Sequence, residues 1–164
     1  MGGLDNVVTF IALLGANDLK IAVLYDYDGK PKQKLQEIVK EKIISSKAVL
    51  NASQFRNLNE LGKDGQASDT EDLFEPEFYL GYFNKTFAKE LKSALINESG
   101  LPNRDRIIDS IECYLKDKKI KLRPSGGFNH YAVASYFASN PPASLDDNTL
   151  SRFEELFKAV NKVL

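Results

Sequence analysis

The sequence predicts an α/β fold, in which helices flank a mostly parallel sheet and a helical C-terminal region follows. An apolar run over 19–25, rich in β-branched and aromatic residues, and a second plausible strand over 47–55 are separated by a stretch with helical periodicity. Beyond residue 75 the patterns are almost entirely helical. The length of 164 residues, 43% of them hydrophobic, suits one domain with a real core.

The chain begins with a predicted helix and a predicted strand. Apolar residues over 7–14 indicate a helix of about ten residues, with Asp5 or Asn6 as its N-cap and Gly15 at its end. The run 19–25 then predicts an interior parallel strand that is covered on both faces.

A second helix and a second strand follow. The polar segment 57–70 predicts a loop, and 47–55 the strand before it. Strand, helix and strand in this order are typical of a parallel sheet, in which ligands lie beyond the carboxyl ends of the strands. The helix, expected over 32–44, has an apolar face made of Leu35, Ile38, Val39 and Ile43.

The second half predicts four helices, the first of which begins at Pro76, a favourable residue for a first turn. We interpret their apolar stripes as core rather than as ligand contacts. The expected division is an α/β core over 1–74 and a helical region over 75–164 packed on the same core. The helices cover 76–95, 103–118, 126–140 and 146–164, and the stripe of the last comprises Leu150, Phe153, Leu156, Phe157 and Val160.

Composition excludes several classes of protein. Cys113 is the only cysteine, which excludes an internal disulfide and a thiolate metal cluster. No apolar run is long enough to cross a bilayer, and the N-terminus does not resemble a signal peptide, so we expect a cytoplasmic protein without a membrane partner. The net charge of −1 gives no chain-wide basic footprint.

One basic segment stands out, "KDKKIKLR" over 116–123. It is either a solvated helix end and strand start or a stripe that contacts nucleic-acid phosphates, since lysine and arginine supply sequence-independent affinity. In the second interpretation Lys119, Lys121 and Arg123 bind nucleic acid.

Two aspartates follow the first predicted strand, Asp26 and Asp28 in "YDYDG". Side chains two positions apart on an extended segment point to the same side. Like charges at that spacing are unfavourable unless a cation offsets them, and Mg²⁺ needs only a few carboxylates. Taken alone, Asp-X-Asp-Gly is ordinary turn chemistry.

A second acidic cluster, "SDTED", precedes the helix expected at Pro76 and contains Ser68, Asp69 and Glu71. Taken alone, it is interpreted as helix capping, because acids favour helix N-termini. Together the two clusters indicate a split metal site, in which two divalent ions about 4 Å apart could hold the attacking and leaving oxygens of a phosphodiester.

The segments "GGLDNVVTFIALLGANDLKIAVLYDYDG" and "SDTEDLFEPEFYLGYFN" resemble the Toprim domain of the OLD-family (overcoming lysogenization defect) ATP-dependent endonucleases. The resemblance extends to "FNHYAVASYF" and "RFEELFKAVNKVL" and covers most of the chain. It implies a Toprim-like (Rossmann-like) sheet, DNA as substrate and a role in phage defence. In that family the domain follows an ATPase domain in the same chain.

The resemblance also implies roles for single residues. Asp26 and Asp28 correspond to the metal-binding Asp-X-Asp motif, and Glu71 to the second acidic motif, with Asp69 and Ser68 adding oxygen ligands. Mg²⁺ or Mn²⁺ is the expected cofactor, and DNA phosphodiester hydrolysis the expected reaction. Asp72 is expected instead to cap the helix that begins at Pro76.

This sequence departs from the family in two places. Toprim domains begin with a strand that ends in a glutamate. Neither this strand nor its glutamate is found in the sequence, so we expect a fragment whose nuclease activity is weak or absent when it is alone. A late helix of the family carries a lysine near its start, where this chain has His130, and both a structural and a catalytic role for His130 stay open. The expected partners are DNA, an ATPase domain or subunit, and a second copy in a homodimer.

Two alternatives stay open. "DYDGK" also resembles the Asp-X-Asp-Gly-Thr signature of haloacid-dehalogenase-like phosphatases, in which Asp26 would be the nucleophile and Asp28 the general acid, although Lys30 stands where Thr or Ser is usual. The other alternative is a non-catalytic nucleic-acid-binding or assembly module, whose acids only cap helices and form turns.

Overall fold

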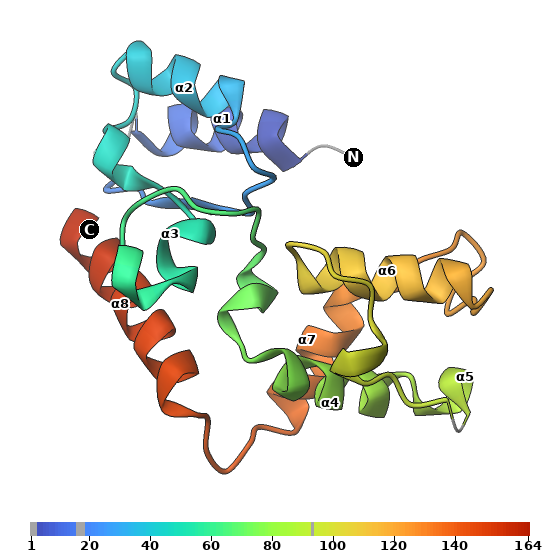
Figure 1. The fold of residues 1–164 in the computed structure, drawn as a ribbon. Coiled ribbons are helices and arrows are strands. Elements are labelled where there is room, and N and C mark those ends of the chain that lie inside the picture. The colour runs from blue at the N-terminus through green and yellow to red at the C-terminus, as the bar shows by residue number, and fades with distance from the viewer. Residues whose placement is uncertain (1–2, 16–18, 93) are drawn as a thin grey trace. The chain divides into compact units, whose positions relative to one another are not determined.

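The computed structural model describes residues 3–15, 19–92 and 94–164 (Figure 1). The chain is rich in helix and has a small parallel sheet, which is an α/β composition. By its internal contacts it divides into two compact units, one formed by Met1–Thr70 with Ser151–Leu164 and the other by Glu71–Leu150. The division into 1–74 and 75–164 stays a prediction. None of the helices in the described ranges is both long and apolar enough to span a bilayer.

The first unit contains a pair of parallel strands. Strand β1 (Val23–Tyr25) pairs with β2 (Val49–Asn51), with Val23 opposite Val49 and Tyr25 opposite Asn51. The chain between the two strands includes helix α2, as the sequence predicts. The helices of this unit are α1 (Gly3–Gly15), α2 (Gln33–Lys40), η1 (Ser46–Ala48), α3 (Ser53–Arg56) and η2 (Leu58–Glu60), together with most of α8 (Asp147–Val163).

Several expectations for this unit are wrong in detail. Both strands are three residues long, shorter than the apolar runs that predict them. Leu24 is 39% exposed, so β1 is not covered on both faces. Helix α1 already begins at Gly3, so neither Asp5 nor Asn6 is its N-cap.

The second strand ends early because a side chain starts a turn there. The Asn51 Oδ1 accepts hydrogen bonds from the Ser53 backbone N–H at 3.1 Å and from its hydroxyl at 2.6 Å. Asn and Asp side chains favour turns in this way, because they offer the backbone a partner outside the ladder. Residues 53–55, predicted as the end of the strand, therefore belong to the short helix α3.

The core of the first unit combines residues from α1, α2 and both strands. The predicted face of α2 is confirmed for Leu35 and Ile38, which are 2% and 4% exposed. Ile43 is instead 44% exposed, because α2 ends at Lys40 and Lys42 takes a left-handed backbone conformation with φ of 59°. The buried members of this cluster are Ile11, Val23, Leu35, Ile38, Ile44 and Ala48.

The second unit is helical. The stretch 76–95, predicted as one helix, is two helices that meet at Phe87. Phe87 leaves the helical conformation with φ of −108° and ψ of 25°, and its backbone N–H donates to the Phe83 carbonyl at the end of the first helix. The helices of this unit are α4 (Pro76–Thr86), α5 (Ala88–Leu91), η4 (Glu98–Gly100), α6 (Ile107–Asp117) and α7 (His130–Ser139), with η3 (Thr70–Leu73) at its start.

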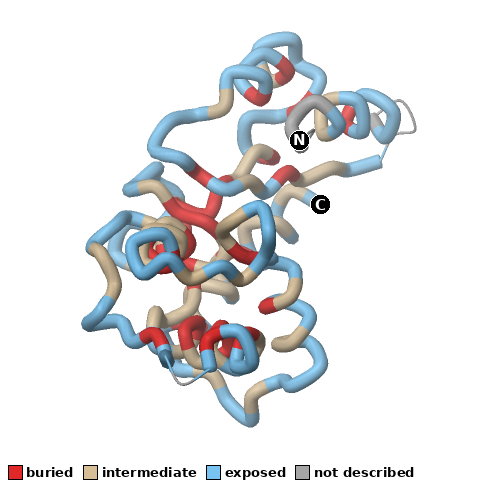
Figure 2. The backbone as a smooth tube through the Cα atoms, turned by 90° about the vertical axis from the view of Figure 1, so that its right-hand side faces the viewer, coloured by how far each residue is buried: buried red, intermediate tan, exposed pale blue. Residues whose placement is uncertain are grey.

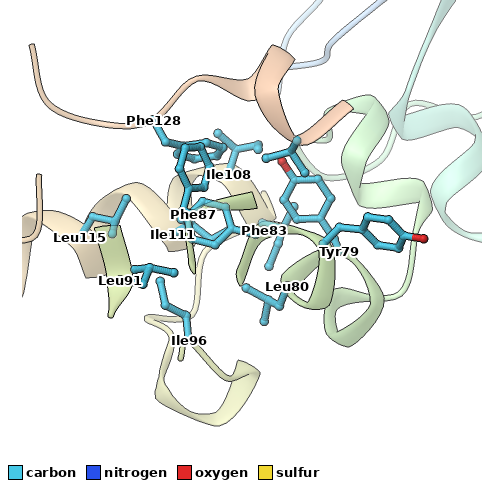
Figure 3. Packing of buried hydrophobic residues seen from close by; sticks show 13 residues of the cluster. Tyr79, Leu80, Phe83, Phe87, Leu91, Ile96, Ile108, Ile111, Leu115 and Phe128 are labelled. Carbon is cyan, nitrogen blue, oxygen red and sulfur yellow. The ribbon is translucent and has the colours of Figure 1, made fainter. Parts of the chain in front are cut away.

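Aromatic side chains form the centre of the second unit. The Phe83 ring lies 5.0 Å from the Phe87 ring and 4.9 Å from the Phe128 ring, centroid to centroid, and Ile111 and Leu115 of α6 pack in the same cluster (Figure 3). Phe83 and Ile111 are fully buried. In the described ranges the buried residues occur in short stretches between exposed or intermediate ones, as Figure 2 shows. The interpretation of the aromatic stripes as core is confirmed for this part of the chain.

The last helix, α8, agrees with its predicted stripe only in part. Leu156 is 3% exposed, whereas Leu150 is 49% and Phe157 58% exposed. A helix of this length turns its apolar residues over a wide arc, and only those that meet a neighbouring element become buried.

Candidate functional site

The two aspartates of the Asp-X-Asp motif lie just beyond the carboxyl end of β1. Asp26 and Asp28 are exposed, while Tyr27 between them is only 5% exposed. This alternation follows from the period of two of an extended segment, and it places both carboxylates on the solvent side. The predicted common orientation of the two aspartates therefore agrees with their burial pattern.

An antiparallel bridge joins this motif to the start of the second acidic cluster. The Tyr27 N–H donates to the Ser68 carbonyl at 2.8 Å, and the Ser68 N–H donates to the Tyr27 carbonyl at 2.7 Å. Next to the bridge, the Thr70 N–H donates to Asp26 Oδ1 at 3.2 Å. Residues more than 40 positions apart thus meet at the carboxyl end of β1, and Asp69 lies on the segment between these two contacts.

Asp28 has a cationic partner. The Lys32 Nζ donates to Asp28 Oδ2 at 2.5 Å, from the loop before α2. The hydrogen bond from Lys32 lowers the pKa of the Asp28 carboxyl below its ordinary value, because it stabilises the charged form. The charge of this carboxylate is therefore already compensated by a residue of the chain.

The polar groups around Asp69 are largely engaged. Asp69 is 6% exposed and Ser68 is fully buried. The Ser68 hydroxyl donates to the Gln66 carbonyl at 3.1 Å and accepts from the Arg56 guanidinium at 3.2 Å, and the same guanidinium donates to the Ala67 carbonyl. Arg56 thus places a positive charge beside this acidic segment, which the sequence analysis did not foresee.

Glu71 and Asp72 belong to the second unit. Asp72 is 6% exposed, and its Oδ1 accepts from the Ile107 N–H at 2.8 Å, at the first residue of α6. Asp72 therefore caps α6, a helix that begins 35 positions further along the chain, whereas the sequence predicts that it caps the helix at Pro76. Glu71 is half-buried in η3.

The carboxyl edge of the strands also holds polar residues that the sequence analysis missed. The Asp64 Oδ1 accepts from Asn51 Nδ2 at 2.8 Å and from Gln54 Nε2 at 2.9 Å. Burial, and then the Asp64 carboxylate, raises the pKa of the Tyr27 hydroxyl, and burial also raises the pKa of Tyr25. The segment "NASQ" (51–54) could have indicated Asn51 and Gln54, since residues at the end of the second strand reach the same edge of the sheet as those at the end of the first.

A pocket of 300 Å³ lies between α2 and the two strands and includes their last residues. Tyr25 and Asn51, the last residues of β1 and β2, line it together with Asp64, Lys32 and Lys40. Its position agrees with the general rule for parallel sheets, which places ligands beyond the carboxyl ends of the strands.

The remaining predicted site residues lie in the second unit. His130 opens α7, with its ring 4.5 Å from that of Phe128 and its Nε2 3.8 Å from Glu112 Oε1. Lys119 and Lys121 are exposed and follow the end of α6.

A divalent metal was expected on the acidic residues. Their carboxylate oxygens are the donor type that Mg²⁺ and Mn²⁺ accept. Among the described residues, however, no group of three or more acids, histidines or cysteines is arranged to hold a metal ion. The donors at the end of β1 therefore fit such a cation in type but are few, and water would complete its coordination.

The fold and this edge define the chain as an α/β protein with an acidic motif at a strand end. No family model, curated protein or solved structure matches it in comparisons with known proteins.

Proposed function

We propose that this chain is a divalent-metal-dependent DNA endonuclease domain, similar to the Toprim domain of OLD-family nucleases. The observation that carries the proposal is the Tyr27–Ser68 bridge, which brings the Asp-X-Asp motif and the start of the second acidic cluster to the carboxyl end of a parallel strand. That edge is where α/β proteins bind their ligands.

The proposed roles follow from these contacts. Asp26, held by the Thr70 N–H, and Asp28 would hold the metal, with Asp69 of the same unit as a further oxygen donor. A bound Mg²⁺ or Mn²⁺ supplies charge neutralisation and activates water for attack on phosphorus. The Lys32 ammonium, which now neutralises Asp28, would compete with the metal for this carboxylate.

A sparse donor set predicts weak binding. Few carboxylates and several waters give affinities on the order of millimolar for a hard divalent cation. We therefore expect low nuclease activity that rises with metal concentration. Lys119, Lys121 and Arg123 would add affinity for DNA phosphates and make binding fall with salt.

The test combines calorimetry with a nicking assay. Wild-type protein titrated with Mn²⁺ should show weak binding and should nick supercoiled plasmid slowly, and Asp26→Asn should lose both. Glu41→Gln removes an exposed acid of the same unit and should change neither. Nicking that survives Asp26→Asn would contradict the assignment, as would the absence of Mn²⁺ binding at millimolar concentration.

The wild-type protein and Asp26→Asn also distinguish a nuclease from the phosphatase alternative. Hydrolysis of p-nitrophenyl phosphate that is lost in Asp26→Asn, without plasmid nicking, would favour the phosphatase over the nuclease.

A further inference from the structure

The second unit has a pocket where α6 ends and the following segment turns back. Its volume is 580 Å³, within the range of roughly 300–1,000 Å³ that is typical of small-molecule sites. Positive charge predominates among the side chains that line it. They include three lysines, one glutamate and two apolar residues: Lys116, Lys119, Lys121, Glu112, Leu115 and Ile120.

A glycine turn forms another part of this pocket. Gly126 and Gly127 have φ of 80° and 62°, a left-handed conformation that glycine adopts without strain. The Arg123 Nε donates to the Gly126 carbonyl at 2.5 Å and so ties the turn to the basic segment. A Cβ on Gly127 would lie 2.7 Å from Glu112 Oε1, which shows how closely the turn approaches α6.

The end of α6 places Lys119 at the pocket. The Ile120 N–H donates to the Leu115 carbonyl at 2.8 Å and the Lys119 N–H to the Lys116 carbonyl at 3.1 Å, the hydrogen-bond pattern of a Schellman motif. Lys119 occupies the left-handed position of this motif, with φ of 56°, where glycine is usual.

The same motif ends α2, with Lys42 in the left-handed position. The backbone conformation is therefore shared by two helix ends, and it does not by itself mark a site. What distinguishes Lys119 is that it lines a pocket with two further lysines, whereas Lys42 lines neither this pocket nor the one at the strand ends. Lys42 consequently offers a matched control for Lys119.

We propose that this pocket binds a single nucleotide. Its phosphate would lie against Lys116, Lys119 and Lys121, because ammonium groups stabilise phosphate charge. Its base would lie against Ile120, which is only partly buried, because Leu115 is 1% exposed and belongs to the core. A flat basic stripe would contact only a nucleic-acid backbone, whereas a pocket of this size admits one nucleotide removed from its stack.

The nucleotide has two sources with the same chemistry, a free nucleotide and the terminal nucleotide of a DNA strand. The proposal concerns residues of the second unit and requires neither Asp26 nor a metal. Failure of the nuclease tests therefore leaves it standing, and its own failure leaves the metal site untouched.

The test is a titration of the ¹⁵N-labelled full chain, followed by amide chemical shifts. Deoxyadenosine 5′-monophosphate should shift amides of residues 115–127 in a saturable manner, and more strongly than deoxyadenosine or inorganic phosphate alone. Equal binding of inorganic phosphate would overturn the nucleotide assignment, as would shifts that fall outside 112–127.

Variants then separate binding from stability. Lys119→Gly should raise the thermal midpoint, because glycine relieves the left-handed strain, and should weaken nucleotide binding about tenfold through loss of a charged contact. Lys42→Gly should raise the midpoint in the same way and leave binding unchanged. Lys121→Gln, whose backbone carries no such strain, should weaken binding with an unchanged midpoint. Unchanged binding in both Lys119→Gly and Lys121→Gln would overturn the proposal.

Oligonucleotides distinguish the two sources. A single strand with a 5′-phosphate that binds more tightly than both the mononucleotide and the same strand without the phosphate identifies a DNA end as the ligand. Tighter binding of the mononucleotide identifies a free nucleotide. Absence of binding by every one of these probes would overturn the proposal.

Discussion

Tyr27 differs from the aspartates on either side of it in where its side chain lies. It is only 5% exposed, whereas Asp26 and Asp28 are exposed. Burial of Tyr27 anchors the motif, and the bridge to Ser68 holds its backbone. The two carboxylates thus project from a constrained segment, which lowers the conformational entropy that a bound cation would otherwise have to offset.

The ion pair between Lys32 and Asp28 predicts how the stability of the fold depends on pH. The pKa of Asp28 is lowered in the folded protein from its ordinary value of 3.8. The ion pair therefore stabilises the fold fully at pH values above 3.8, and this contribution is lost as the pH falls through the lowered pKa. The Asp28 side chain is 40% exposed, so solvent screening keeps the contribution below about 1 kcal/mol.

We expect Lys32→Met to return the pKa of Asp28 toward its ordinary value and to strengthen Mn²⁺ binding, because the competing ammonium is gone. A ¹³C-carboxyl NMR titration measures the first effect and calorimetry the second. Lys63→Met, at another exposed lysine of the same unit, should leave both unchanged. A normal carboxyl titration with unaltered metal affinity in Lys32→Met would show that Asp28 is not a ligand.

Helix α6 depends on a residue outside it. Its own N-cap, Arg106, makes no side-chain capping bond, and the Asp72 carboxylate accepts from the first helical N–H instead. An acid at this place also interacts favourably with the helix dipole.

The capping contact predicts a graded loss of stability. Asp72→Ala should lower the free energy of unfolding by about 1–2 kcal/mol, because it leaves a buried N–H without its acceptor. Asp72→Asn keeps an acceptor oxygen and should lose less. Urea denaturation measures both, and equal losses in the two variants would mean that the negative charge, rather than the hydrogen bond, stabilises α6.

At the scale of the whole molecule, the chain contains two compact units, each with its own cluster of buried apolar side chains. The last helix contributes Val163 to the cluster of the first unit, so the two ends of the sequence contribute to one core. Domains with separate cores commonly unfold with separate stabilities.

A core substitution tests this separation. Phe83→Ala removes a fully buried ring and should cost about 3–5 kcal/mol. Hydrogen exchange should then accelerate across the second unit, while amides of β1 and β2 keep their protection. Tyr131→Ala, at a residue that is 76% exposed, should have little effect. Equal acceleration in both units would show that they unfold as one.

Local pattern was enough to predict most helices and the strand pair, because hydrophobic periodicity is a property of neighbouring residues. It failed where an element ends through a contact: β2 stops where the Asn51 side chain bonds to Ser53, and α4 stops before Phe87. For the site, adjacency of Asp26 and Asp28 was evident from spacing. The roles of Asp64 and Arg56 were not, since both depend on partners that the chain brings together from about ten positions away.

The sequence by itself determined the α/β composition, the common orientation of the two aspartates and their place after a strand. These follow from periodicity and from the rule that successive side chains of an extended segment alternate. Only the tertiary structure decided which distant residues form hydrogen bonds with the acidic segments: Thr70 with Asp26, Ser68 with Tyr27, and Ile107 with Asp72. Such pairings join residues 35 to 44 positions apart, and packing of the whole chain, rather than local preference, selects them.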